Sequence, residues 1–191
     1  MFSNLSLLTK STTEAMVNIT GYSEYHQNLW ISCAFDRPST SNAHVFVCNP
    51  AIGNMTNSNS FQSRWVHGHN CTGKPAFFVG AANAAWLNNW GFYDICGEQN
   101  CGGLLDLRGV SMGVIRNVID WDAAVSYTMP VIYLGKTAQG TPCVSMVVEA
   151  SGRPTEVSLP NPTYDVQTDN GVTARVSMCN PQGARASIIA G

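Results

Sequence analysis

The chain has 191 residues, of which 45% are hydrophobic and only 12% are charged, and its formal net charge is -2. That length is enough for a single domain, 1–191, with its own hydrophobic core. The basic side chains are few and scattered, no apolar stretch reaches the roughly 18 residues of a membrane span, and the start shows no signal-peptide pattern. We therefore expect no direct binding of nucleic acid and no membrane span.

The first half of the chain predicts two short helices separated by irregular segments. The sequence STTE at 11–14 matches a capping box, which predicts a helix over about 12–19 after an N-terminal arm within 1–20. The segment GNMTNSNSFQS at 53–63 has no hydrophobic periodicity and predicts an exposed loop. The alanine-rich stretch that ends at a glycine predicts a second helix over 81–89.

The clearest strand patterns lie in the last third of the chain. Two apolar runs flank the turn residues 137–142, which predicts a hairpin followed by another strand. Alternating apolar residues on both sides of Asn170-Gly171 predict a second hairpin, in which Gly171 takes the positive φ of a two-residue turn. These patterns indicate a C-terminal sheet over 128–191. The expected fold is mainly β, an antiparallel sandwich or small barrel with one or two short helices.

Seven cysteines are many for a reduced compartment and suit an oxidised one, so we expect a disulfide-bearing protein. No CxxC spacing is present, which argues against a cysteine zinc site. Loop-closure entropy favours short local bridges, and a longer bridge would join two predicted strands of the C-terminal sheet. The expected pairs are Cys33 with Cys48, Cys96 with Cys101, and Cys143 with Cys179, which leaves Cys71 over.

Two small groups of residues could hold a metal ion. On a strand His67, His69 and Cys71 would share one face, but structural zinc needs four ligands and catalytic zinc usually three, and an ordinary strand leading into a turn is the favoured interpretation. Asp120 and Asp122 would also share a strand face, as a metal site or an acid and base pair, although a solvated strand end explains them more simply. We therefore expect no metal and no cofactor.

Trp86 and Trp90 are four residues apart and would share one face of the predicted helix. If exposed, they could form a platform for sugar rings or for a partner protein. If buried, they are part of the core, which is the commoner place for large aromatic side chains.

The favoured function is a non-enzymatic structural or adhesive subunit of an extracellular, virion or pilus-type assembly. A polar, nearly uncharged surface, a β-rich pattern and the absence of common catalytic motifs all support it. The apolar stretches MFSNLSLL and ASIIAG at the two ends suit packing on a neighbouring copy, so self-association is expected. A carbohydrate- or receptor-binding module is the first alternative, and a secreted metal-dependent hydrolase is the second.

The C-terminal segments SGRPTEV and VSMCNPQGARASIIAG resemble the C-terminal strands of minor type IV pilins. The resemblance covers only this end of the chain and assigns no residue a role.

Overall fold

A computed structural model describes most of the chain. The described residues are 1–8, 11, 13–20, 28–36, 43–50, 56–62, 65–67, 74–80, 87–98, 102–121, 129–152, 165–177 and 188–190. Every regular element among them is a β-strand, and every pairing between two named strands is parallel.

The strands form three sheets. Sheet 1 contains β1 (Phe2–Ser3), β2 (Ser6–Leu8), β4 (Leu29–Ile31), β5 (Ala34–Asp36), β7 (Ser60–Gln62), β8 (Trp65–His67), β11 (Gly91–Glu98), β14 (Val114–Trp121), β16 (Met146–Glu149) and β18 (Ala174–Ser177). Sheet 2 contains β3 (Val17–Ile19), β6 (Phe46–Cys48), β9 (Phe77–Gly80), β12 (Leu105–Arg108), β15 (Ile132–Gly135), β17 (Val166–Thr168) and β19 (Ile188–Ala190). A short sheet 3 pairs β10 (Leu87–Asn88) with β13 (Val110–Ser111).

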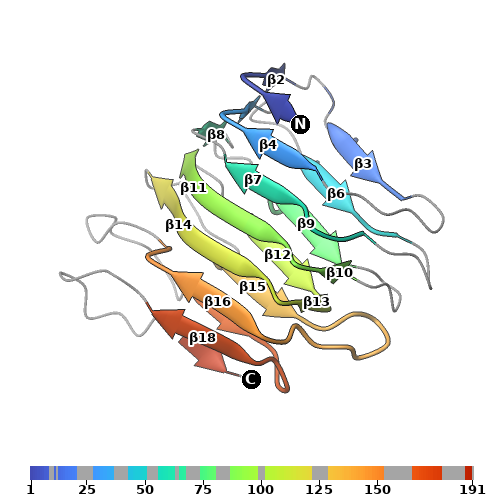
Figure 1. Cartoon of the computed structure of the whole chain (residues 1–191), viewed down its shortest axis with the longest axis vertical. Coiled ribbons are helices and arrows are strands. Elements are labelled where there is room, and N and C mark those ends of the chain that lie inside the picture. Colours follow the sequence, from blue (N-terminus) through green and yellow to red (C-terminus); the bar gives the residue numbers. More distant parts are fainter. Residues whose placement is uncertain are drawn as a thin grey trace.

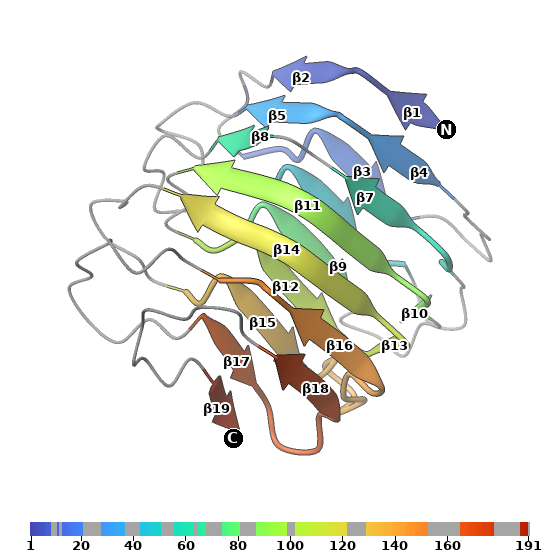
Figure 2. The ribbon, with the colours of Figure 1, turned by 60° about the vertical axis from the view of Figure 1, so that its left-hand side comes forward.

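The chain winds from sheet 1 to sheet 2 and back, so that each strand lies beside the strand one repeat later (Figures 1 and 2). In sheet 2, for example, Phe46 pairs with Phe77, and Phe77 pairs with Leu105. Most repeats are about 30 residues long, within the range of solenoid proteins. The fold is a parallel β-solenoid, with the N-terminus at one end of the stack and the C-terminus at the other. We call the one or two sheet 1 strands of a repeat, together with the sheet 2 strand that follows them, a rung.

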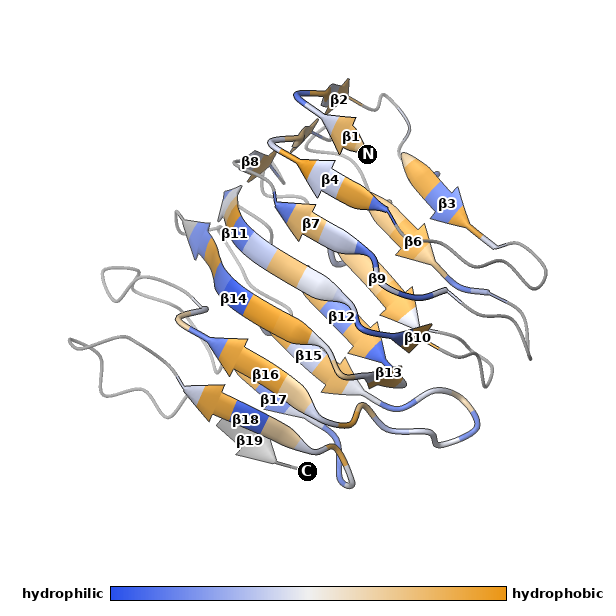
Figure 3. Cartoon of the chain, in the orientation of Figure 1, coloured by the Kyte–Doolittle hydropathy of each residue, from blue (hydrophilic) through white to orange (hydrophobic). Residues whose placement is uncertain are grey.

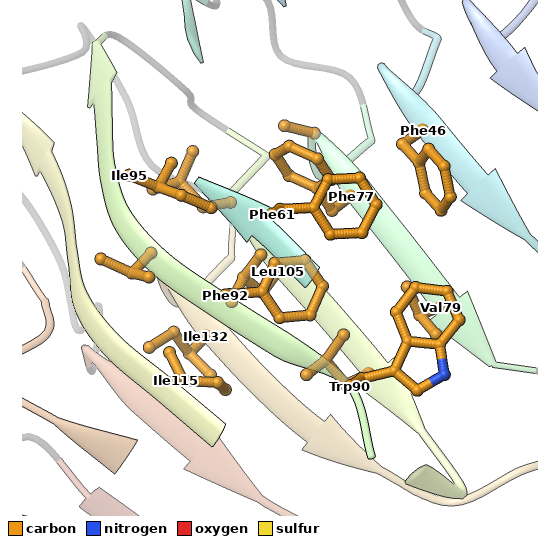
Figure 4. Close-up of a cluster of buried hydrophobic side chains, with 14 of the residues drawn as sticks. Phe46, Phe61, Phe77, Val79, Trp90, Phe92, Ile95, Leu105, Ile115 and Ile132 are labelled. Atoms are coloured by element: carbon orange, nitrogen blue, oxygen red, sulfur yellow. The ribbon is translucent and has the colours of Figure 1, made fainter. Parts of the chain in front are cut away.

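The hydrophobic core lies between sheets 1 and 2, where apolar side chains of successive rungs stack on one another (Figure 4). One inward column in sheet 1 consists of Phe2, Trp30, Phe61, Phe92, Ile115, Val148 and Val176, each paired with the next. The facing column in sheet 2 includes Phe46, Phe77, Leu105 and Ile132. Burial of these side chains stabilises the folded state by about 25 cal/mol per Å² of apolar surface removed from water, which is the dominant favourable contribution to folding.

Buried polar side chains between the rungs also bond from one repeat to the next. The Asn28 side-chain amide donates to Asn59 Oδ1 at 3.1 Å, and the backbone amide of Asn88 donates to Asn57 Oδ1 at 3.0 Å. In both pairs the partners are 31 residues apart. Stacked asparagines of this kind satisfy polar groups that would otherwise be costly to bury.

Two columns of left-handed residues bend each rung at the same places. The first column contains Asn4, Ser32 and Ala150, which follow β1, β4 and β16, and Asp94 and Asn117, which lie within β11 and β14, all with φ between 47° and 53°. The second precedes sheet 1 and contains Ser58, Asn89, Met112 and Ser145, with φ between 54° and 59°. Backbone bonds join the rungs at these bends, as from Ser32 N to Gln62 O and from Asn89 N to Ser111 O. The bends therefore repeat because the backbone of one rung templates the next.

The prediction of an antiparallel sandwich or barrel was wrong, although the predicted turns exist. Gly140 and Gly171 both have φ of +84°, as turn glycines require. However, each turn connects a strand of sheet 2 to a strand of sheet 1, namely β15 to β16 and β17 to β18, and these strands do not pair with each other. An isolated antiparallel bridge between Lys136 and Pro142 crosses the first turn, but it does not extend into a hairpin of the two strands. Alternation of apolar residues shows only that one face of a strand is buried, and it does not identify the partner strand.

The predicted helices are also corrected, because the described residues contain no helix. Ser11 Oγ does accept bonds from the Thr13 and Glu14 amides, at 3.3 and 2.9 Å, as a helix cap would. The chain then enters β3 rather than a helix, because Val17 joins the core. Of the predicted helix 81–89, residues 87–88 form β10 and residues 81–86 lie outside the described part.

The predicted exposed loop at 53–63 was also wrong where it is described. It contains β7, and the side chain of Phe61 is fully buried.

The disulfide prediction is corrected for the described cysteines. Cys33, Cys48, Cys96 and Cys143 are thiols rather than halves of disulfides, and Cys71, Cys101 and Cys179 lie outside the described residues. The winding separates the expected partners, since Cys33 follows β4 in sheet 1 whereas Cys48 ends β6 in sheet 2. No helix in the described part of the chain is long and apolar enough to cross a membrane.

Candidate functional site

Exposed apolar side chains gather at the N-terminal end of the stack. Figure 3 colours the ribbon of this end by hydropathy, and β1 includes a hydrophobic position. Among the described residues the exposed large hydrophobic side chains are Met1, Phe2, Leu5, Leu8, Leu29, Trp65 and Met112. The first four belong to the first rung, and Leu29 belongs to the strand beside it. Leu8 is 66% exposed and Met1 81% exposed. We call β1 and β2 with Met1, Phe2, Leu5 and Leu8 the N-terminal edge.

The N-terminal edge is the open end of the aromatic column. The Phe2 ring stacks on Trp30 with centroids 4.2 Å apart, and Trp30 stacks on Phe61 at 5.7 Å. Trp30 is 6% exposed, whereas Phe2 is 38% exposed because no described residue covers its outer side. An aromatic ring that would be core in any interior rung therefore faces outward along the solenoid axis.

The backbone of the N-terminal edge is open as well. Within the described residues β1 pairs only with β4, and β2 pairs only with β5. An edge strand that leaves amide and carbonyl groups unpaired is a template for another strand, and proteins usually guard such edges with charged side chains or proline. Residues 1–8, MFSNLSLL, contain neither a charged side chain nor a proline.

The C-terminal end of the stack presents a second open edge. Within the described residues β18 pairs only with β16, and β19 pairs only with β17. The β18 residues Ala174, Arg175 and Ser177 are exposed, and Val176, which continues the inward column, is partly buried. We call β18 and β19 the C-terminal edge.

The outward face of sheet 2 carries a cluster of partnered polar and aromatic side chains. The Arg108 guanidinium lies over the rings of Phe78 and Tyr133, 5.6 and 5.5 Å from their centroids. It also donates two bonds to Asp106, at 2.9 and 3.0 Å, and the hydrogen bond to Asp106 is the main reason why the pKa of Arg108 is raised. Burial, followed by the hydrogen bond to Asp169, raises the pKa of Tyr133 to about 12. This cluster joins neighbouring rungs through their side chains.

The outward face of sheet 1 carries a second polar cluster around Trp65. Trp65 Nε1 donates to Glu98 Oε2 at 2.7 Å, and its ring lies 4.8 Å from the His67 ring. His67 Nδ1 lies 3.8 Å from Asp36 Oδ1. Trp65 is 37% exposed, so this face presents one aromatic ring beside two carboxylates.

The structure places only part of the two candidate metal groups, for which no metal was expected. His67 lies at the end of β8, whereas His69, Cys71 and Asp122 are outside the described residues. Asp120 is fully buried rather than solvated, and its Oδ1 lies against Gly97. No group of three or more His, Cys, Asp or Glu side chains that could hold a metal ion occurs in the described part of the chain.

Of the two tryptophans that could form either part of the core or a ligand or partner surface, Trp90 is among the described residues. Trp90 is 1% exposed and its Nε1 donates to the Thr56 carbonyl at 3.0 Å, which places it in the core. Trp86 is outside the described residues.

The described thiols with shifted pKa values are poor nucleophiles. Burial is the largest cause that raises the pKa of Cys143 to about 11, and Cys143 Sγ lies 3.2 Å from the Leu107 carbonyl. Burial also raises the pKa of Cys96, with further contributions from Glu98 and Asp120. Since the thiolate is the reactive form, neither residue is activated for covalent catalysis.

Comparison with known proteins identifies no relative: no family model, no curated protein and no solved structure matches this chain. Function must therefore be argued from the surfaces themselves. Sequence reasoning singled out the apolar MFSNLSLL segment but missed Trp65 and the Arg108 cluster. Gly80 and Gly135 are the register partners of Arg108. A Cβ at Gly80 would collide with Arg108 Cβ and one at Gly135 with the Tyr133 ring, so these two glycines were the available signal for that cluster.

Proposed function

We propose that the protein is a non-enzymatic structural subunit that works by associating with copies of itself. The observation that supports this most strongly is the N-terminal edge, where exposed Met1, Phe2, Leu5 and Leu8 occur together with strand backbone that no further described strand pairs on its outer side. An apolar edge strand that carries no charged side chain favours the addition of further strands. Covering it in an assembly removes the exposed apolar surface and pairs the open backbone.

The outward faces support the same proposal. On sheet 1 Asp94 accepts bonds from Gln62 and Asn117, and Arg116 bonds to Glu149 in the next rung. These side chains are used in bonds between rungs, as expected of a surface that holds a scaffold together. The proposed location, extracellular or on the surface of a virion or cell, now depends on the polar and weakly charged composition, because the four described cysteines are thiols.

The test is the mass of the native protein in solution, measured by light scattering and sedimentation over a wide concentration range. The wild-type chain should form oligomers. Leu8→Lys should weaken association by at least about tenfold in dissociation constant, or about 1.4 kcal/mol, because it places a charge on the N-terminal edge.

Met112→Lys is the matched control. Met112 is also an exposed apolar side chain, 55% exposed, but lies away from both edges of the stack. It should leave the oligomers intact. A wild-type protein that stays monomeric at high concentration, or equal effects of the two lysines, would contradict the proposal.

A binding module is the second candidate, supported by the exposed ring of Trp65 beside Glu98. An aromatic face flanked by hydrogen-bond acceptors suits the stacking of a sugar ring. Tryptophan fluorescence titrations with neutral oligosaccharides, on the wild type and on Trp65→Ala, test it. Saturable quenching that Trp65→Ala abolishes would favour this function.

A further inference from the structure

We propose that copies of this chain stack head to tail along the solenoid axis, with β18 of one copy paired in parallel with β1 of the next. In this register Val176 lies beside Phe2 of the next copy, and Ser177 lies beside its Ser3. The inference rests on the proposed self-association and specifies its geometry and partner surface.

The register follows from the columns within one chain. Phe2 pairs with Trp30, and the same column ends at Val148 paired with Val176. The neighbouring outward column begins at Ser3, paired with Ile31, and ends at Ser177, paired with Glu149. A second copy that continues both columns must place its Phe2 against Val176 and its Ser3 against Ser177.

The side chains at the two edges suit this contact. Val176 is only partly buried and packs against the core from the last described position of the inward column. Phe2 is stacked on Trp30 on one side and exposed on the other. Placing Val176 against the open side of Phe2 would bury both, as the column does in every interior rung.

A second copy covers more of each end than any single strand would. Among the described strands, both sheets have an open edge at the N-terminal end, β1 and β2 in sheet 1 and β3 in sheet 2. At the C-terminal end the corresponding edges of the described part are β18 and β19, also one in each sheet. A single extended peptide could pair with one sheet, whereas the C-terminal edge of another copy presents two strands of the same two sheets at once.

Strand direction distinguishes two possible contacts between copies, one between unlike edges (head to tail) and one between two identical edges. All pairings of named strands are parallel, so a continued parallel ladder requires the N-terminal edge of one copy on the C-terminal edge of another. This contact is heterologous, because it joins two different surfaces. Unless the rotation from one copy to the next closes a ring, repeated contacts of this kind generate an open filament.

Disulfide trapping between two separately substituted proteins tests the register. Ser3→Cys is mixed with Ser177→Cys, both at exposed positions, and oxidised mildly. Adjacent strands are about 4.8 Å apart, which fits the Cα separation of a disulfide. The control mixes Ser3→Cys with Arg175→Cys, which is displaced by two residues and therefore separated by more than about 7 Å. Wild-type protein gives the background from the native cysteines.

The in-register mixture should give on the order of tenfold more cross-linked dimer than the displaced mixture. Equal trapping in both mixtures, or efficient dimerisation of Ser3→Cys alone, would overturn the head-to-tail register. Oligomers by light scattering without in-register trapping would overturn this inference and leave the proposed function standing. A monomeric wild type would overturn both.

Discussion

Replacing Phe61 by alanine should cost more stability than any substitution at the edges of the solenoid. Phe61 is fully buried and stacks on Trp30 at 5.7 Å and on Phe92 at 5.3 Å, and its centroid is 4.8 Å from that of Phe46. A buried Phe to Ala change costs about 3–5 kcal/mol, and each lost aromatic pair adds to the local penalty. Because Phe61 has aromatic neighbours on both sides, we expect a loss of about 4–5 kcal/mol.

Urea unfolding, followed by circular dichroism below the concentration at which the protein associates, measures this loss. Phe61→Leu keeps most of the volume and should cost much less, about 1–2 kcal/mol. Phe2→Ala removes the same ring from the open end of the column, where it is 38% exposed, and should cost about 1 kcal/mol. If Phe61→Ala costs no more than Phe2→Ala, with an unchanged dependence on urea, the column is not the centre of the core.

Three further substitutions test the geometry of the rungs. Gly80→Ala should destabilise the protein by about 1–3 kcal/mol in urea unfolding. The φ of Gly80 is +151°, and a Cβ there would lie 2.6 Å from Arg108 Cβ and 2.7 Å from its carbonyl oxygen. An unchanged unfolding midpoint would refute this. Met112→Asn should stabilise by up to about 1 kcal/mol in the same assay, because asparagine tolerates the left-handed φ of 58° better, and a loss of stability would count against it. Tyr133 stabilises the fold in its protonated form, so this contribution is complete below pH 10 and lost as pH rises towards the folded pKa of about 12. Thermal melts of Tyr133→Phe should therefore differ from wild type at neutral pH and converge with it between pH 10 and 12, whereas a constant difference would exclude the linkage.

Turns were predictable from the sequence, but strand partners were not. Gly171 and the turn at 137–142 were identified because a positive φ or a tight bend demands particular residues locally. Partner choice depends on which segments lie beside each other after winding. An alternating strand can bury one face equally well in a sandwich or in a solenoid, and short segments between turns favoured the hairpin interpretation.

A repeat signal in the sequence could have indicated the solenoid. TNSNSF at 56–61 and LNNWGF at 87–92 occupy equivalent places in two rungs, and Asn57 bonds to residue 88 of the next repeat. The similarity consists of one asparagine and one phenylalanine position and is easily missed. The polar residues of 53–63 favoured an exposed loop, whereas the Asn59 side chain is fully buried. Its burial is possible because it accepts a bond from Asn28 of the preceding rung and donates one to the Asn57 carbonyl of its own rung.

The candidate edge was partly predictable. The apolar segment MFSNLSLL indicated a contact with a neighbour, which is the surface that the structure leaves open. The clusters around Trp65 and Arg108 could not be predicted, because their members come from different repeats. Asp36, His67 and Glu98 are register partners only because three separate strands stack.

Stacking of this kind makes the molecule nearly one-dimensional in its energetics. A rung gains its stability from itself and from its immediate neighbours, so cooperativity passes along the axis from one repeat to the next. Rungs at the two ends have one neighbour instead of two and should fray first. Asn89 and Met112 occupy equivalent left-handed bends in neighbouring repeats. Deletion or duplication of the whole repeat between two such bends would keep every strand beside a strand of the same column. Length is then a property that mutation can adjust in steps of one rung without redesigning the core.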